Sequence, residues 1–221
     1  MRESTVELST VVYRGTFERM LPWLPTPGTP GFATLCKVLS AHGLSPVGIE
    51  LEAPTIRLND VVLSLSLLGE RLKVRLSYGW IEFLINNLYE GDDEALIDIA
   101  NHLFTVLREI DTELSQAVSR YRCYAHLKLA PLQVDAFMKD HLGCKETSSE
   151  LLPDAFAYEL KWDQLKAGEQ ARIVVAKSSQ FQDALFVDLT IEYVSPGEPA
   201  QILERINQDY ERAIGSIGLK S

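Results

Sequence analysis

The sequence is poor in the features that mark several large classes of protein. Its 221 residues include three cysteines, too few for a disulfide-stapled scaffold. The most apolar stretch, residues 61–68, contains two serines, whereas a membrane-spanning helix needs about 20 apolar residues. Basic residues are scarce, since 21 Lys and Arg stand against 31 Asp and Glu, which gives a net charge of −10. A general nucleic-acid coat protein needs the opposite balance, because Lys and Arg neutralise phosphates.

The motifs of common enzyme classes are missing as well. The chain has no Gly-x-Ser-x-Gly nucleophile turn, no phosphate-binding Gly-x-x-x-x-Gly-Lys-Ser/Thr loop and no dinucleotide-binding Gly-x-Gly-x-x-Gly. His42 and His102 fall within predicted helices and belong to no motif. The sequence therefore favours a non-catalytic protein without a cofactor, although it does not decide whether the protein is an enzyme.

What is present is the composition of an ordinary globular protein. Hydrophobic residues make up 46% and charged residues 24% of the chain, both typical of soluble domains. The chain is long enough to bury a large core without a metal or a disulfide. The odd number of cysteines and the acidic start, without an apolar signal segment, predict a cytoplasmic protein of bacterial style.

Hydrophobic periodicity predicts the elements of the first half. Alternation predicts strands over residues 6–13, 47–52, 61–68, 72–78 and 80–85. A proline-rich loop, residues 21–31, contains Trp23 and leads to a helix over 31–42 that ends at Gly43. A long helix opens at residues 91–94 and carries an apolar stripe of Leu96, Ile99, Leu103, Leu107, Ile110 and Leu114.

The second half shows a similar order of patterns. A strand over residues 120–129 precedes a short helix with Pro131 at its first position and Gly143 as its stop. A polar loop over 144–154 leads to strands over 156–162, 171–175 and 185–193. Residues 195–199 break the chain before a last helix over 202–217.

These patterns predict an α+β fold made of two similar halves, residues 1–117 and 118–221. Each half is expected to be an antiparallel sheet covered by a long helix, in the order β-α-β-β-β-α. This order of elements resembles the helix-grip folds, in which a curled antiparallel sheet holds one long helix.

Candidate metal ligands are better explained as structural residues. Cys123-x2-His126 and His141-x2-Cys144 supply two Cys and two His, but residues three apart on a strand point to opposite faces. The acids at residues 90–94 suit the start of a helix. Glu50 and Glu52 share a strand face, as a solvated pair or as an acid–base pair. We therefore assign no metal ligand.

The principal functional hypothesis is a non-catalytic protein-interaction, scaffold or accessory protein that works in an oligomer or a larger complex. The candidate partner-binding residues are Trp23 in the proline-rich loop and one strand face formed by Arg120, Arg122, Tyr124, His126 and Lys128. Arg and Tyr on a sheet can also stack on single-stranded bases. The net acidity and the nearby acids Glu159, Asp188 and Glu192 favour salt pairs across the strands instead.

The alternative hypothesis is a small-molecule-binding protein. In a helix-grip arrangement, the space between the sheet and the long helix can hold an apolar ligand. Large aromatic side chains could line such a pocket, and the candidates are Tyr78, Trp80, Tyr158, Trp162 and Tyr193.

Overall fold

The computed structural model describes residues 2–52, 60–87, 92–114, 116–131, 133–142, 155–194 and 199–220. The strands are β1 (Arg2–Glu3), β2 (Thr5–Phe17), β3 (Ile49–Glu52), β4 (Val62–Leu67), β5 (Leu72–Ser77), β6 (Trp80–Asn86), β7 (Gln116–Lys128), β8 (Ala155–Leu160), β9 (Gln170–Lys177), β10 (Ala184–Val194) and β11 (Leu219–Lys220). The helices are α1 (Pro30–Ser40), α2 (Asp92–Ile110), α3 (Gln133–Leu142) and α4 (Pro199–Ser216), with a 3-10 turn at Pro46–Gly48.

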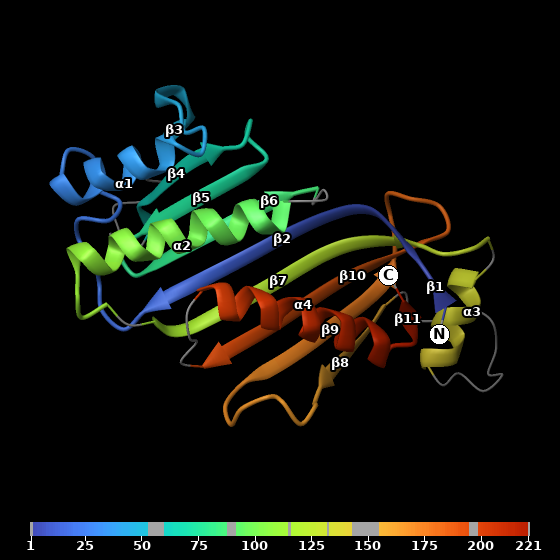
Figure 1. The fold of residues 1–221 in the computed structure, drawn as a ribbon. Helices are drawn as coiled ribbons and strands as arrows, with labels where there is room; N and C mark the ends of the chain where they lie inside the picture. Colours follow the sequence, from blue (N-terminus) through green and yellow to red (C-terminus); the bar gives the residue numbers. More distant parts are fainter. Residues whose placement is uncertain are drawn as a thin grey trace.

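Nine strands form one antiparallel sheet, which confirms the predicted α+β class. The strand order is β3-β4-β5-β6-β2-β7-β10-β9-β8, so β2 and β7 lie side by side at the centre (Figure 1). Because these two strands come from different predicted halves, the strands of both halves belong to a single sheet. The short strands β1 and β11 pair in parallel and bring the two ends of the described chain together.

The long helices lie on the same face of the sheet. Helix α2 packs against α1 on one side and α4 on the other (Figure 1), and α3 packs on β8 at one end of the sheet. Alternate residues of each strand point to this face, and they are mostly buried and apolar, including Val74, Phe83, Tyr13, Val187 and Ile173. None of the described helices is both long and apolar enough to cross a membrane.

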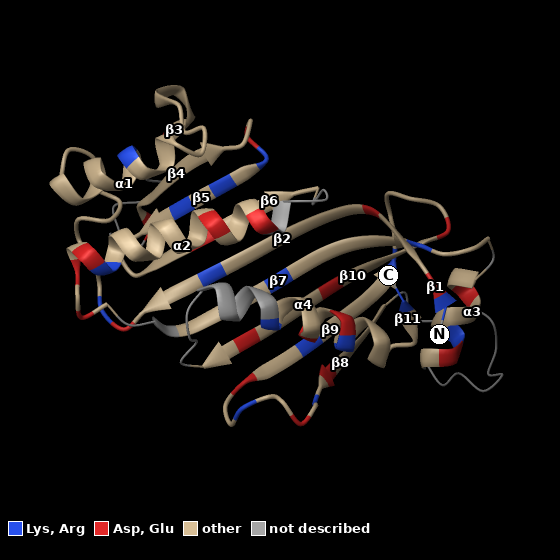
Figure 2. Cartoon of the chain, viewed as in Figure 1, with Lys and Arg blue, Asp and Glu red and all other residues tan. Residues whose placement is uncertain are grey.

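The described helices leave the opposite face of the sheet uncovered, and a charged row crosses it. The strand register places Arg75, Glu82, Arg14, Arg120 and Glu192 next to one another on five neighbouring strands. Figure 2 shows basic residues on β5, β2 and β7 and acidic residues on β10.

Glu82 is the most buried member of this charged row. Its side chain is only 4% exposed. Arg14 Nε donates to Glu82 Oε2 at 2.7 Å, and Arg75 Nη1 donates to Glu82 Oε1 at 2.9 Å. Glu82 therefore lies between two guanidinium groups, while Arg120 Nε donates to Glu192 Oε1 at 2.7 Å on the other side of the centre.

Most predicted elements are confirmed, and the errors lie at their ends. Helix α2 ends at Ile110, which is 38% exposed, so the apolar stripe is shorter than predicted. Leu114 lies in a turn closed by a hydrogen bond from its amide to the Asp111 carbonyl. Helix α3 begins at Gln133 rather than at Pro131, because a turn in which the Gln133 amide donates to the Ala130 carbonyl precedes it. Strand β8 ends before Trp162.

Other predictions fall outside the described residues. They are the polar loop over residues 144–154, the stop at Gly143 and most of the chain break over residues 195–199. The side chains of the acids at residues 90–93, interpreted as a helix start, also lie outside the described residues.

The start of α1 is fixed by the residues that the proline-rich loop supplies. Thr29 caps the helix by accepting a hydrogen bond from the Phe32 amide at 3.3 Å, and Pro30 is its first residue. Trp23 folds back over Gly31, where an added Cβ would lie 2.7 Å from Trp23 Cε3. Beyond the other end of the helix, Gly43 adopts a φ of +86°, as a helix-ending glycine does.

The close approach of Trp23 to Gly31 leads to the first prediction. Gly31→Ala should lower the free energy of unfolding by about 1–3 kcal/mol, because the indole ring must move away from the new methyl group. Gly79→Ala is the matched control, since an added Cβ there meets nothing within 4 Å. Urea unfolding followed by tryptophan fluorescence measures both variants, and equal midpoints would contradict the prediction.

Candidate binding site

An apolar cavity lined by described residues lies between α2 and α4, above the central strands. It has a volume of about 310 Å³. Its walls come from β2, α2, β7 and α4, through Val6, Ser9, Val11, Leu96, Ile97, Tyr121, Cys123, Ile206, Asn207 and Tyr210. Cavities of this size fall at the lower end of the range of small-molecule sites.

The floor of the pocket follows from the pairing of β2 with β7. Val11 lies opposite Cys123 in this pair, and both side chains point to the helix-covered face. The neighbouring pair on the same face is Tyr13 and Tyr121. Residues that are 112 positions apart in the sequence thus form one continuous surface under the helices.

Two helices complete the walls. Leu96 and Ile97 lie near the beginning of α2, and Ile206 and Tyr210 are one turn apart on α4. Residues four positions apart on a helix share a face, which is why both α4 residues reach the same cavity. Asn207 is exposed, so it lies at the rim, and Val6 on the β2 side is 50% exposed.

The environment of the floor keeps its titratable groups neutral. Cys123 is 4% exposed, and burial raises the pKa of its thiol to about 11. Burial also raises the pKa of Tyr121 well above its ordinary value of 10.0, with Cys123 and Tyr210 adding to the shift. Since the thiolate is the nucleophilic form of cysteine, Cys123 is an inert wall residue at neutral pH.

The described lining residues therefore suit binding rather than catalysis. None of them carries a charge at neutral pH, and their polar atoms are hydroxyl, thiol and amide groups. Such a site favours an uncharged, mainly apolar molecule, because a charged group would lose its hydration without gaining an ionic partner.

None of the five aromatic residues predicted to bind a ligand belongs to the lining of this pocket. Tyr78 lies in the turn between β5 and β6, and Trp80 lies under the Arg14 guanidinium on the uncovered face, 4.3 Å from carbon to ring centroid. The Tyr158 hydroxyl donates to the His141 carbonyl at 2.9 Å. Trp162 follows β8, and its buried indole N–H has no hydrogen-bond partner among the described residues.

The fifth of these residues, Tyr193, belongs to a buried polar network under α4. Its hydroxyl donates to Asp209 Oδ2 at 3.1 Å, and the side chains of Asp209 and Glu169 are both fully buried. Arg205 joins the two acids, with 2.9 Å from Nη1 to Glu169 Oε1 and 3.4 Å from Nε to Asp209 Oδ2. This network ties α4 to the sheet beside the pocket.

The predicted partner-binding residues are on two separate surfaces. Arg120, Arg122, Tyr124, His126 and Lys128 all lie on the uncovered face of β7, whereas Trp23 packs beside α1. Arg122 makes two hydrogen bonds to Asp188, at 2.9 and 2.7 Å, and Arg120 pairs with Glu192. The acid Glu159 instead lies 3.6 Å from Lys161.

Cys123 and His126 lie on opposite faces of the sheet, as their spacing on a strand predicts. Cys123 faces the pocket under the helices, and His126 lies on the opposite face with its Nδ1 2.9 Å from Ser178 Oγ. His141 is on α3, where its Nδ1 lies 3.0 Å from the Phe137 carbonyl oxygen. Cys144 is outside the described residues.

Most residues of the pocket were not found from the sequence. Their apolar periodicity predicted burial, but a filled core has the same periodicity as a pocket wall. The pairing of β2 with β7 and the spacing of α2 and α4 determine the cavity, and neither leaves a local signal in the sequence.

No protein-family model matches the chain, and no curated protein sequence matches it.

The buried network under α4 gives a prediction for acid stability. Burial alone would raise the pKa of Glu169, but hydrogen bonds from Arg205 and from the Lys166 amide outweigh it and lower the pKa below its ordinary 4.5. Glu169 therefore stabilises the fold above pH 4.5, and this contribution is lost as the pH falls through the lowered value.

Glu169→Gln should cost about 1.5–3 kcal/mol of unfolding free energy at pH 7, the range for hydrogen bonds to charged groups. The difference from the wild type should shrink as the pH falls below 4.5. Urea midpoints across this pH range measure it, with the exposed Glu211→Gln as the control. A constant difference at every pH would contradict the assignment.

Proposed function

We propose that the protein binds a small, uncharged and mainly apolar molecule in the pocket between α2 and α4. The observation that carries this proposal is a cavity of about 310 Å³ with apolar walls and no charged lining residue among those described. An engineered cavity of about 150 Å³ holds benzene. This pocket has about twice the volume of that cavity, so it has room for a molecule roughly twice as large as benzene. The polar atoms of Ser9, Asn207 and Tyr210 can orient the ligand.

The proposed ligand is a small apolar molecule, as in the alternative hypothesis drawn from the sequence. The residues that bind it are different from the five aromatic residues predicted there. The walls proposed now come from four elements that meet at the centre of the molecule. The pocket lies above the central strands and between two helices, whereas the helix-grip comparison suggested a space under one long helix. The floor cysteine has a structural role in this proposal, since burial keeps its thiol protonated at neutral pH.

We also keep the proposal of two similar halves. Its support is the strand order, because β6, β5 and β4 follow β2 outward in the way that β10, β9 and β8 follow β7. The central pair Tyr13 and Tyr121 would then lie close to the axis that relates the halves. The long helix of each half, α2 or α4, would supply one wall of the shared pocket. Bacterial origin and a cytoplasmic location stay predictions.

The neutral probe N-phenyl-1-naphthylamine tests the pocket. Its fluorescence should rise on saturable binding of one molecule per chain. Asn207→Trp should weaken this binding at least tenfold, because a bulky ring at the rim closes the entrance. Gln208→Trp is the matched control, since it places the same ring at the next exposed position of α4, outside the pocket lining. Non-saturable binding, or equal affinity in both variants, would contradict the proposal.

A second candidate function is protein interaction through the uncovered sheet face, as the principal sequence hypothesis expected. An aromatic cluster there favours it: the ring centroid of Phe186 lies 6.3 Å from that of Tyr124 and 5.2 Å from that of His126. The partner we propose is a second copy of the chain. The acids and bases of this face pair with one another, so two copies that each carry a net charge of −10 can approach here with little repulsion.

Sedimentation velocity tests the second candidate. The wild type should dimerise with rising concentration, and Phe186→Asp should shift it to the monomer, because a carboxylate would be buried in the contact. Ile110→Asp is the control, since it places the same charge at an exposed apolar residue on the helix side. A wild type that stays monomeric, or a dimer unaffected by Phe186→Asp, would contradict it.

A further inference from the structure

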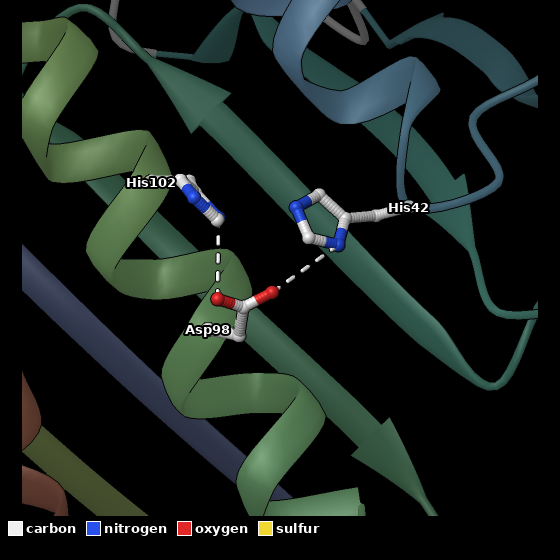
Figure 3. Close-up of side chains that lie close together, drawn as sticks. All are labelled: His42, Asp98 and His102. Atoms are coloured by element: carbon white, nitrogen blue, oxygen red, sulfur yellow. Dashed lines mark ion pairs between the residues drawn. The ribbon is translucent and has the colours of Figure 1, made fainter.

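Two histidines and one aspartate converge where the end of α1 meets α2. Asp98 and His102 are four residues apart on α2, so they lie one above the other on the same face of the helix. His42 follows the last residues of α1, and the packing of α1 against α2 brings it to the same place. Figure 3 shows both imidazole rings next to the Asp98 carboxylate.

The ligand atoms of the three side chains are close together. His102 Nδ1 lies 3.3 Å from Asp98 Oδ1, and His42 Nδ1 lies 3.8 Å from Asp98 Oδ2. The centroids of the two imidazole rings are 5.4 Å apart. One ligand atom from each residue can be chosen so that all three lie within 4.8 Å of one another.

These separations are close to those that a bound transition metal imposes. Two ligands at about 2.0–2.1 Å from a tetrahedral zinc ion are about 3.3 Å apart. The His102–Asp98 distance already has this value, whereas the three ligand atoms together lie within 4.8 Å of one another, so the His42 side chain moves closer when the metal binds. The 3.8 Å separation between His42 Nδ1 and Asp98 Oδ2 is too long for a hydrogen bond.

The donor set selects the class of metal. Imidazole nitrogen suits Zn²⁺, Cu²⁺ and Ni²⁺, whereas Mg²⁺ and Ca²⁺ prefer sites made of oxygen ligands. Three protein ligands leave one position of a tetrahedral ion for water or for a ligand from another molecule. The side chains of Asp98 and His102 are 59% and 56% exposed, so an ion can enter from solvent, while that of His42 is 16% exposed and forms the inner wall.

We propose that His42, Asp98 and His102 form a binding site for a divalent transition metal of the zinc class, with one open coordination position. The metal joins the segment after α1 to the middle of α2. The site is separate from the apolar pocket, whose lining includes none of these three residues, so it does not rest on the proposed function. It adds metal ligands that the sequence analysis did not assign.

Zinc binding to the purified full chain, freed of metal with a chelator, tests the site by titration calorimetry. The wild type should bind one equivalent of Zn²⁺, and Asp98→Asn and His102→Ala should each weaken binding at least tenfold. Both positions are exposed, so the variants should fold. Glu109→Gln is the control, because it removes an exposed carboxylate elsewhere on α2 and should change the affinity less than threefold.

Thermal unfolding provides an independent readout. Because zinc binds the folded site, it should raise the Tm of the wild type and of Glu109→Gln, but not that of His102→Ala. Circular dichroism of the metal-free variants verifies that they are folded. The absence of stoichiometric Zn²⁺ binding in the wild type would overturn the proposal. Equal Zn²⁺ affinity in the wild type, Asp98→Asn and His102→Ala would overturn it too, because the metal would then lie elsewhere.

Discussion

The antiparallel pairing of β2 with β7 is the interaction on which the rest of the structure depends. It runs from Thr5 opposite Lys128 to Phe17 opposite Gln116, with a shift of register near each end. Each of the other strands of the large sheet lies outside this pair, on one side or the other. A slip of one residue would turn the floor of the pocket toward the uncovered face and the arginines of the charged row toward the core. Burial on one face therefore fixes the register for both faces.

This register also places two positive charges next to each other, and carboxylates on the neighbouring strands pair with them. Arg14 and Arg120 lie directly opposite each other at the centre of the sheet, where like charges are unfavourable. Each arginine has a carboxylate on the strand outside it, Glu82 on β6 and Glu192 on β10. The charges thus alternate outward from the centre, so the arginines of β5, β2 and β7 pair with the acids of β6 and β10.

The sequence predicted what depends on local patterns and missed what depends on pairing over long distances. Alternation of apolar residues located the large strands, and the apolar stripe located α2, because both patterns report burial of one face. The strand order is different, since nothing near Val11 indicates that Cys123 will lie beside it. The same limit applies to the metal ligands: the spacing of Asp98 and His102 is visible on a helix, but only the packing of α1 on α2 adds His42. The five aromatic residues illustrate the converse limit, because chemical suitability alone does not place a side chain in the lining of the pocket.

The position of α2 decides the geometry of both candidate sites. Ile97 and Asp98 are consecutive, and successive residues on a helix point about 100° apart, so Ile97 reaches the pocket while Asp98 faces the segment after α1. A rotation of α2 that widened the pocket would therefore also change the distance from Asp98 to His42. The packing of α2 between α1 and α4 resists such a rotation, because packed interiors accommodate few alternative arrangements. One helix, held between two others, thus determines the shape of the apolar cavity and the spacing of the three potential metal ligands.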